Sequence, residues 1–339
     1  MRKKLQQFQN TLLAQGAPGT IIEIGSGSRP PLYHAANGVF SRTTQRPLTE
    51  FDGFRIASMS KTFTAVLAMQ LAEQGHIGLD ASVSDFIDLS AMPMFADAVT
   101  SDVSIRHLLT HQSGLWDFAM SRAWSDKLMK TPRVFRPPQQ TLDWAFTHGH
   151  SQSKPGDSYL YSDTGYVALG LLIERVTGLA WGDLVRRYIL TPLNMSDTWL
   201  EGYESPRSTL SHTYAGSYDG LQIHGSADWA AGGHVSTTSD LARFMRGLFT
   251  NQLFSGQKTL ADMLTGATRA DGSTYGCGLY CRQSGSVTLI GHSGFWGSDM
   301  AWVPQWNLSI ASTVNHTGED HASMLDAIVL VLQQQSGAR

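Results

Sequence analysis

Ser58 and Lys61 stand three residues apart at the start of a long apolar segment, and a hydroxyl beside an amine can form an activated nucleophile without a histidine. In a helix, residues three apart share a face with Cβ atoms about 5–6 Å apart, so the amine can lie next to the serine oxygen. The residues after Lys61 are apolar on nearly every side, which predicts a buried helix. Burial and the positive helix N-terminus both favour the neutral, basic amine. The pair therefore predicts a serine that attacks acyl groups.

The S-x-x-K spacing alone is weak evidence, because it occurs at three places: Ser58 to Lys61, Ser151 to Lys154 and Ser255 to Lys258. The second copy is followed at once by Pro-Gly and the third contains a glycine, so both are typical of loops or turns. Only the first copy opens an apolar segment. This context favours chemistry at the first copy over the alternative of a helix-capping serine beside a surface lysine.

The composition limits the classes of function. The chain has 339 residues, 42% hydrophobic and 16% charged, with a formal charge of -3, which favours two structural units, although one large domain is possible. These values do not favour disorder, a nucleic-acid surface or a membrane-binding patch, and they suit small neutral partners better. The basic start is not followed by a continuous apolar stretch, and no run reaches about 18 apolar residues. We therefore expect a soluble, cytoplasmic protein, unless a leader was removed, and make no prediction of its oligomeric state.

The two cysteines, Cys277 and Cys281, lie in a segment that we interpret as a strand. Four residues of strand span about 13 Å, whereas a disulfide needs Cα atoms within about 7 Å. We expect free thiols, which suits a reducing compartment, and neither a redox nor a metal-binding role.

The two ends of the chain have similar patterns. An amphipathic helix over 1–15 precedes strands at 20–24 and 32–36, and the Gly-Ser-Gly between these strands favours a hairpin over a dinucleotide site because two prolines follow it. The buried helix follows over about 58–74. Late in the chain the pattern predicts these elements: a helix at 239–249, strands at 278–282, 287–290, 300–303 and 308–314, and a helix at 322–333.

The middle of the chain is predicted to be mostly helical, because helical patterns at 103–110 and 166–177 stand among long loops. We predict an α/β fold of the α+β type, in which both ends share one antiparallel sheet flanked by the N- and C-terminal helices. Residues 1–75 and 226–339 would form this α/β domain, and 76–225 an inserted helical domain.

An acyl-attacking serine also needs a proton shuttle and donors for the oxyanion. Tyr161 and Asp163 follow a Lys-Pro-Gly turn, which would present both from a loop. His292 lies in Gly-His-Ser-Gly-Phe-Trp-Gly, between two predicted strands, and such a glycine-framed strand can bring backbone amides close to a substrate.

In this order, Ser58-x-x-Lys61, Leu108-Leu-Thr-His-Gln-Ser-Gly-Leu115, Tyr161-Ser-Asp163 and His292-Ser-Gly294 resemble the serine β-lactamase-like superfamily. Within it, the chain is most similar to the branch with class C β-lactamases, D-alanyl-D-alanine carboxypeptidases, family VIII esterases and D-amino-acid amidases. The resemblance extends over nearly the whole chain and implies a β-lactamase/transpeptidase-like fold.

The resemblance also implies roles. Ser58 would be acylated, Lys61 and Tyr161 would pass its proton to the leaving group, and Tyr161 would later help to activate water. The backbone amides of Ser58 and Phe295 would form the oxyanion hole. His292 would be the fourth catalytic residue, because it stands where many relatives have the lysine of a K-T-G box. It keeps a hydrogen-bond donor there but weakens the fixed positive charge.

Asp163 departs from the family pattern, which commonly has asparagine at this position. An ionised aspartate only accepts hydrogen bonds, whereas an asparagine amide also donates to an acyl side-chain carbonyl. This difference disfavours penicillin-type amides. Asp163 could instead pair with Lys61 or attract a substrate amino group, and the sequence leaves both open.

Other residues complete the expected site. The predicted substrate contacts beyond Asp163 are Trp116, Phe118, Ser293, Gly294 and Trp296, and the aromatic ones favour compact apolar acyl groups. His111 is interpreted as structural rather than as a base. The chain has no G-x-S-x-G, which disfavours an α/β-hydrolase nucleophile elbow.

We therefore predict a serine hydrolase that cleaves small esters or amides, including D-amino-acid derivatives, through an acyl-enzyme on Ser58, with neither a metal nor an organic cofactor. The alternatives are a D-alanyl-D-alanine carboxypeptidase or class C-like β-lactamase, an acyltransferase, and a non-catalytic penicillin-binding relative.

Overall fold

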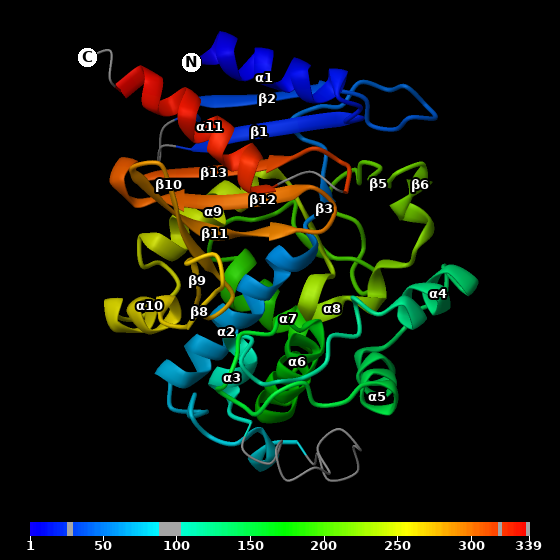
Figure 1. The fold of residues 1–339 in the computed structure, drawn as a ribbon, viewed down its shortest axis with the longest axis vertical. Coiled ribbons are helices and arrows are strands. Elements are labelled where there is room, and N and C mark those ends of the chain that lie inside the picture. The colour runs from blue at the N-terminus through cyan, green and yellow to red at the C-terminus, as the bar shows by residue number, and fades with distance from the viewer. Residues whose placement is uncertain (26–29, 88–102, 318–320, 337–339) are drawn as a thin grey trace.

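The computed structural model describes residues 1–25, 30–87, 103–317 and 321–336. Eight strands in this part of the chain form one antiparallel sheet (Figure 1). In sheet order they are β2 (Tyr33–Gly38), β1 (Gly19–Gly25), β13 (Leu308–Thr313), β12 (Ser298–Val303), β11 (Val287–Gly294), β10 (Tyr280–Ser284), β9 (Thr274–Tyr275) and β8 (Ala267–Thr268).

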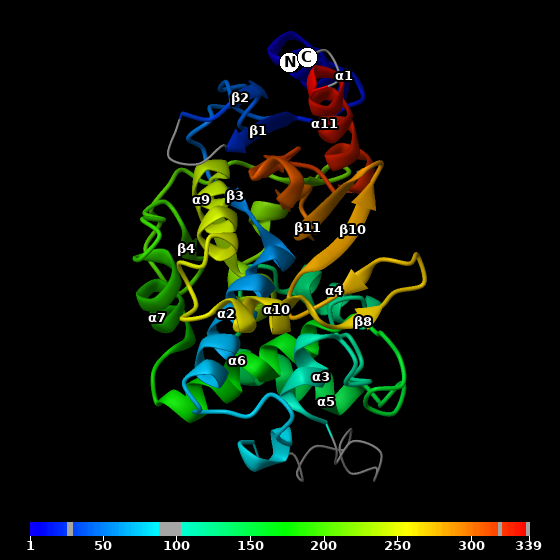
Figure 2. The same cartoon turned by 90° about the vertical axis from the view of Figure 1, so that its left-hand side faces the viewer.

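The two ends of the chain meet in this sheet, as the sequence predicts. Strand β1 pairs antiparallel with β13, with Ile21 opposite Thr313. Helices α1 (Arg2–Ala14) and α11 (His321–Ser336) lie over the same face of the sheet, with both termini at one end of the molecule (Figures 1 and 2). The fold is thus a mixed α/β structure whose antiparallel sheet is flanked by the terminal helices.

Strand β1 is apolar on both sides because both faces of the sheet are covered. Successive side chains point to opposite faces, so Ile22 packs with α1 through Leu5 and with α11 through Ile328. Ile21 faces the larger core, where it joins Phe244 of α9 (Thr238–Phe249). This two-sided burial explains why Ile21 and Ile22 stand side by side in the strand.

Helix α2 (Ser60–Glu73) runs from the sheet into the helical part of the molecule, and its residues from Ser60 to Met69 are buried. The helices of the middle region are α3 (Ile105–Leu109), α4 (Arg122–Lys130), α5 (Pro138–His148), α6 (Asp163–Thr177) and α7 (Trp181–Val185). Helices α8 (Trp229–Gly232) and α10 (Gln257–Leu264) come later in the chain. The domain boundaries at 75 and 225 stay a prediction.

Smaller sheets connect these parts. Strand β7 (His234–Ser236) pairs with β3 (Phe54–Arg55) on one side and β4 (Trp199–Leu200) on the other. A separate hairpin consists of β5 (Tyr214–Ala215) and β6 (Tyr218–Asp219). Strand β3 leads directly into the turn that carries Ser58, so the small sheet fixes the approach to α2.

The tyrosine segment differs from its predicted loop. Helix α6 begins at Asp163 rather than near 166, because the Ser162 hydroxyl accepts a hydrogen bond from the Gly165 amide at 3.3 Å and caps the helix. Only Tyr161 is therefore presented from the loop, whereas Asp163 is held by the first turn of α6.

The cysteine segment also differs in detail. Residues 275–281 do not form one strand, because Gly278 takes a positive φ of 72° and turns the chain between β9 and β10. Cys277 and Cys281 are nevertheless free thiols, which confirms the expectation. Among the described helices, none is both long and apolar enough to cross a bilayer.

Candidate active site

The nucleophile turn places Ser58 at the start of α2. A short 3₁₀ turn over Ala57–Met59 joins β3 to the helix. Ala57 takes a φ of 45°, in the left-handed region that costs a non-glycine residue about 1–3 kcal/mol. The surrounding structure holds this strain, and it leaves Ser58 half-buried where the two halves of the fold meet.

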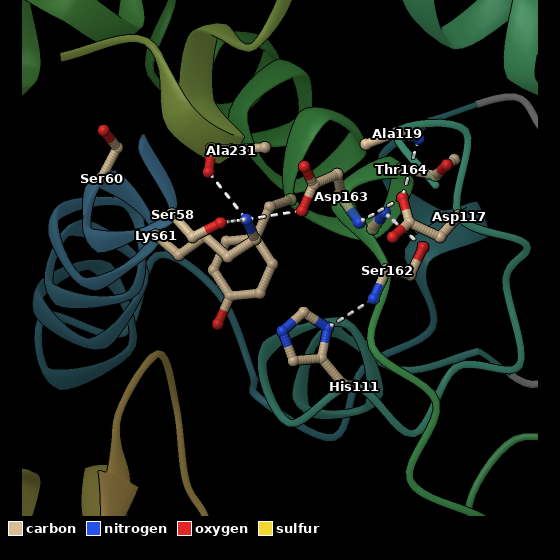
Figure 3. Close-up of polar contacts among 12 residues, drawn as sticks. Ser58, Ser60, Lys61, His111, Asp117, Ala119, Ser162, Asp163, Thr164 and Ala231 are labelled. Atoms are coloured by element: carbon tan, nitrogen blue, oxygen red, sulfur yellow. Dashed lines mark hydrogen bonds and ion pairs between the residues drawn. The ribbon is translucent and has the colours of Figure 1, made fainter. Parts of the chain in front are cut away.

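Lys61 is fully buried and has three close partners (Figure 3). Its Nζ donates to Ser58 Oγ at 3.0 Å and to the Ala231 carbonyl at 2.8 Å, and it lies 2.6 Å from Asp163 Oδ1. Three acceptors match the three N–H groups of an ammonium. The contact with the Asp163 carboxylate matches one of the two roles that the sequence left open for Asp163, pairing with Lys61.

Tyr161 lies beside this pair. The Lys61 Nζ is 4.9 Å from the centre of its ring. Burial raises the pKa of the Tyr161 hydroxyl well above its usual range, the Asp163 carboxylate adds to the rise, and hydrogen bonding with Ser58 opposes it. The hydroxyl therefore keeps its proton at neutral pH and is suited to donate it.

Asp117 supports Asp163 from behind, and the sequence analysis missed it. Its Oδ1 accepts the amide hydrogens of Asp163 at 3.2 Å and of Ala119 at 3.0 Å (Figure 3). Burial, and secondarily the Asp163 carboxylate, raises the pKa of the Asp117 carboxyl from 3.8 to about 7. The sequence feature that could have identified Asp117 is its place between two aromatic residues, Trp116 and Phe118, shortly after the Gln-Ser-Gly turn.

His111 holds the tyrosine segment in place. Its Nδ1 accepts the Ser162 amide hydrogen at 3.1 Å, its carbonyl accepts that of Leu160 at 2.8 Å, and its ring lies 4.2 Å from the Tyr161 ring between centroids. Burial lowers the pKa of His111 well below its usual range, and the Lys61 charge lowers it further. A neutral imidazole with these contacts agrees with the structural role expected from the sequence.

His292 lies on β11 and is 3% exposed. Its Nε2 lies 3.0 Å from the Tyr275 hydroxyl, and its Nδ1 lies 2.8 Å from the Ser293 carbonyl. The Tyr161 ring is 6.4 Å away between centroids. Both ring nitrogens are thus engaged, and His292 borders the site without offering a free cation. Tyr275 is a second residue that the sequence analysis missed.

The end of β11 lies against the nucleophile turn. A Cβ atom on Gly294 would stand 2.2 Å from the Ile56 carbonyl oxygen, so only glycine permits this approach. The hydrogen bonds found among the described residues leave the amides of Ser58 and Phe295 unused. These two amides are available to an oxyanion, as the resemblance implies.

The predicted substrate contacts have different surroundings. Trp296 is partly exposed and lies 5.9 Å from the Arg55 guanidinium, and Trp116 is partly exposed beside Trp144. Phe118 is fully buried against Trp124, so it packs beneath the site. The part of the chain that the structure describes contains no group of three or more His, Cys, Asp or Glu side chains placed to hold a metal.

Comparisons with known proteins identify relatives of this chain. A family model described as Beta-lactamase matches residues 3–333. A penicillin-binding protein of Bacillus subtilis (strain 168) is 28% identical over 322 residues, which cover 87% of this chain and 67% of that protein. Esterase EstB of Burkholderia gladioli is 31% identical over 187 residues, or 53% of this chain, and the match spans only 47% of the esterase.

A solved structure has nearly the same fold throughout. The D-amino acid amidase from Ochrobactrum anthropi SV3, in complex with D-phenylalanine, superposes with a TM-score of 0.83 at 25% identity. The superposition covers 99% of each chain.

Proposed function

The chain belongs to the beta-lactamase family, and from this premise we propose that it is a hydrolase that cleaves small esters or amides through an acyl-enzyme on Ser58. The observation that carries the proposal is the set of contacts around Lys61, which link the Ser58 hydroxyl to the Asp163 carboxylate through one ammonium group. The Ser58 hydroxyl, the Lys61 amine as proton carrier and the Asp163 carboxylate as proton acceptor thus lie next to one another in space.

Acylation begins when the Lys61 ammonium gives a proton to Asp163 and becomes an amine. The amine then takes the Ser58 proton while Oγ bonds to the acyl carbon and the carbonyl electron pair moves onto oxygen. The amides of Ser58 and Phe295 would bind this oxyanion, a contribution of about 3–4 kcal/mol per donor in comparable enzymes. Tyr161, whose raised pKa keeps its hydroxyl protonated at neutral pH, would give this proton to the leaving alcohol or amine as the acyl–leaving-group bond breaks.

Deacylation reverses the proton path. Water attacks the acyl carbon and its proton passes to Tyr161, the Ser58 oxygen leaves with a proton from Lys61, and Asp163 returns its proton to Lys61. The net reaction consumes one water and releases one acid and one alcohol or amine, with every side chain returned to its starting state.

The relatives support an ester or amide substrate, since they include an esterase and a D-amino acid amidase. A carboxypeptidase or β-lactamase is less well supported. Such enzymes act on substrates with a carboxylate, and His292 has both ring nitrogens engaged at the position where many relatives have a lysine.

Four substrates test the proposal: a nitrophenyl ester of a short acid, a D-amino-acid amide, a D-alanyl-D-alanine peptide and a chromogenic cephalosporin. We expect turnover of the ester and the amide, a mass increase on Ser58 when an acylating probe is added, and loss of both in Ser58→Ala. Full activity in Ser58→Ala would refute the assignment. Ester product formed only with added alcohol would indicate an acyltransferase, and absence of any adduct would indicate a non-catalytic relative.

A further inference from the structure

The positive charges near Ser58 all have anionic partners. Arg55, three residues before Ser58, donates to both Glu201 carboxylate oxygens at 2.7 Å and to the carbonyls of Gly220 and Ile223 at 2.6 Å. Its guanidinium is therefore fully engaged.

Two other cations near the site are also paired. Lys61 is bound to Asp163, and Arg269, which stacks on Tyr280 at 4.7 Å, pairs with Asp271 at 2.9 Å. Within the described residues, these contacts leave none of the three cations near the site unpaired. A substrate carboxylate would find no unpaired cation among them.

Asp228, in contrast to these paired cations, is an anionic side chain without a partner in the part of the chain that the structure describes. It lies directly before α8, and neither a hydrogen bond nor an ion pair to its carboxylate occurs among the described residues. Burial raises the pKa of this carboxyl from 3.8 to about 6, and the Asp163 charge adds to the rise, while Arg55 and Lys61 oppose it. Asp228 is partly exposed, so a substrate can reach it, and a bound cation would stabilise a partly desolvated carboxylate that has no partner within the described ranges.

The position of Asp228 relates it directly to the nucleophile. A Cβ atom on Gly232 would stand 3.6 Å from the Asp228 carboxyl carbon and 3.5 Å from the carbonyl carbon of Ala57. The carboxyl group and the peptide bond that leads into Ser58 thus both border Gly232. The ammonium of an α-amino acyl group lies two bonds from the acyl carbon, so it must also stand close to Ser58.

Helix α8 is held rigidly beside α2. The Thr64 hydroxyl donates to the Ala230 carbonyl at 2.7 Å, and the Lys61 ammonium donates to that of Ala231. Trp229, the next residue after Asp228, takes a strained φ of 35° and packs on Trp181 at 5.2 Å between ring centroids. Strain of this kind persists where the surroundings fix the backbone, often at functional sites.

We infer that Asp228 binds the ammonium group of the substrate, so the acyl donors are amine-bearing esters and amides, such as those of amino acids. This inference rests on the proposed acyl-enzyme at Ser58 and names the class of compound that it accepts. It assigns amine recognition to Asp228, because the other candidate, Asp163, is already paired with Lys61.

The test compares two amides that differ only in the amino group, D-phenylalanine amide and 3-phenylpropanamide. We expect the wild-type protein to have the higher kcat/KM for the amine-bearing amide, and Asp228→Asn to lower the ratio of the two values by about tenfold or more. The matched control is Asp183→Asn, the same chemical change at an exposed position of α7, which should keep the wild-type ratio. Asp163→Asn should affect both amides alike, since it acts through Lys61.

Binding is measured in the Ser58→Ala background by calorimetry, so that the result does not depend on turnover. We expect D-phenylalanine amide to bind about tenfold more tightly than 3-phenylpropanamide or better, and Asp228→Asn to remove most of the difference. Equal affinity of the two amides would overturn the inference even if the Asp228 variant failed to fold. Failure of both amides to turn over, with the affinity difference intact, would count against the proposed hydrolase while supporting the amine site.

Discussion

Lys61 and Asp163 form a buried ion pair with 2.6 Å between Nζ and Oδ1, and the same Nζ lies 3.0 Å from the Ser58 hydroxyl. The sequence left two roles open for Asp163, and this contact supports pairing with the lysine. It also changes the proposed proton path, because a charged lysine must first give up a proton before it can accept one from Ser58. The carboxylate is the acceptor in place for that step.

Asp163→Asn tests this path through the rate of ester hydrolysis. Without the carboxylate, the Lys61 ammonium has no acceptor beside it for the proton that it must give up, so we expect kcat/KM to fall by about 10²-fold or more. Asp157→Asn, at an exposed loop position, is the control and should keep the wild-type rate. An unchanged kcat/KM in Asp163→Asn would rule out the carboxylate as proton acceptor.

Asp117→Asn tests the cost of the buried acid behind Asp163. The pKa of Asp117 is raised from 3.8 to about 7 in the folded protein, so between these pH values the folded state binds more protons than the unfolded state. Stability is therefore lost as pH rises through this window, and the cost is complete above it. The asparagine keeps the acceptor oxygen but cannot ionise.

We therefore expect Asp117→Asn to raise the free energy of unfolding by about 2–4 kcal/mol at pH 8 and to change it little at pH 4. Urea unfolding at both pH values measures the difference. Asp126→Asn on α4, where the carboxylate is 61% exposed, should change neither value by much. A gain of equal size at both pH values would contradict the raised pKa.

His111→Phe separates support from base catalysis. The substitution keeps a ring but removes the acceptor for the buried Ser162 amide, which should cost about 1–3 kcal/mol of stability and reduce kcat. Because His111 is neutral in the folded protein, the shape of the pH–rate profile should not change. Loss of one limb of that profile would instead identify His111 as a base.

Gly294→Ala tests the approach of β11 to the nucleophile turn. The added methyl would meet the Ile56 carbonyl oxygen, so the end of the strand must move away and carry the Phe295 amide with it. We expect kcat/KM to fall by about 10²-fold or more, similar to the loss of one oxyanion donor. Gly256→Ala, which has open space around the new methyl, is the matched control for rate and for thermal stability. Wild-type acylation rates in Gly294→Ala would exclude the Phe295 amide from the site.

The regular elements were largely predictable because their signals are local. The apolar run after Lys61 predicted the buried helix α2, and the pattern at 20–24 predicted strand β1. The start of α6 was missed although Ser162, three residues before Gly165, carries an N-cap signal. The turn at Gly278 was missed because the alternation of aromatic and glycine residues in this segment resembles the alternating pattern of a strand.

The site was less predictable, because its decisive contacts join segments far apart in the chain. Asp117, in the loop before α4, meets Asp163 at the start of α6, and Tyr275 of β9 meets His292 of β11. Neither pairing leaves a local pattern. Whether Lys61 is charged depends on the same kind of contact, so helix periodicity could predict its burial but not its partner.

The positions of Ser58 and β11 in the chain set the order in which the site is completed during synthesis. Ser58 and Lys61 leave the ribosome long before β11 has been made, so a nascent chain holds the nucleophile without the strand that carries Phe295. Sheets built from distant segments also fold slowly, because the entropy of loop closure is lost before the contacts between the strands can stabilise the chain. The proposed acylation chemistry is therefore a property of the finished chain, and a partly made one should not trap acyl groups on its serine.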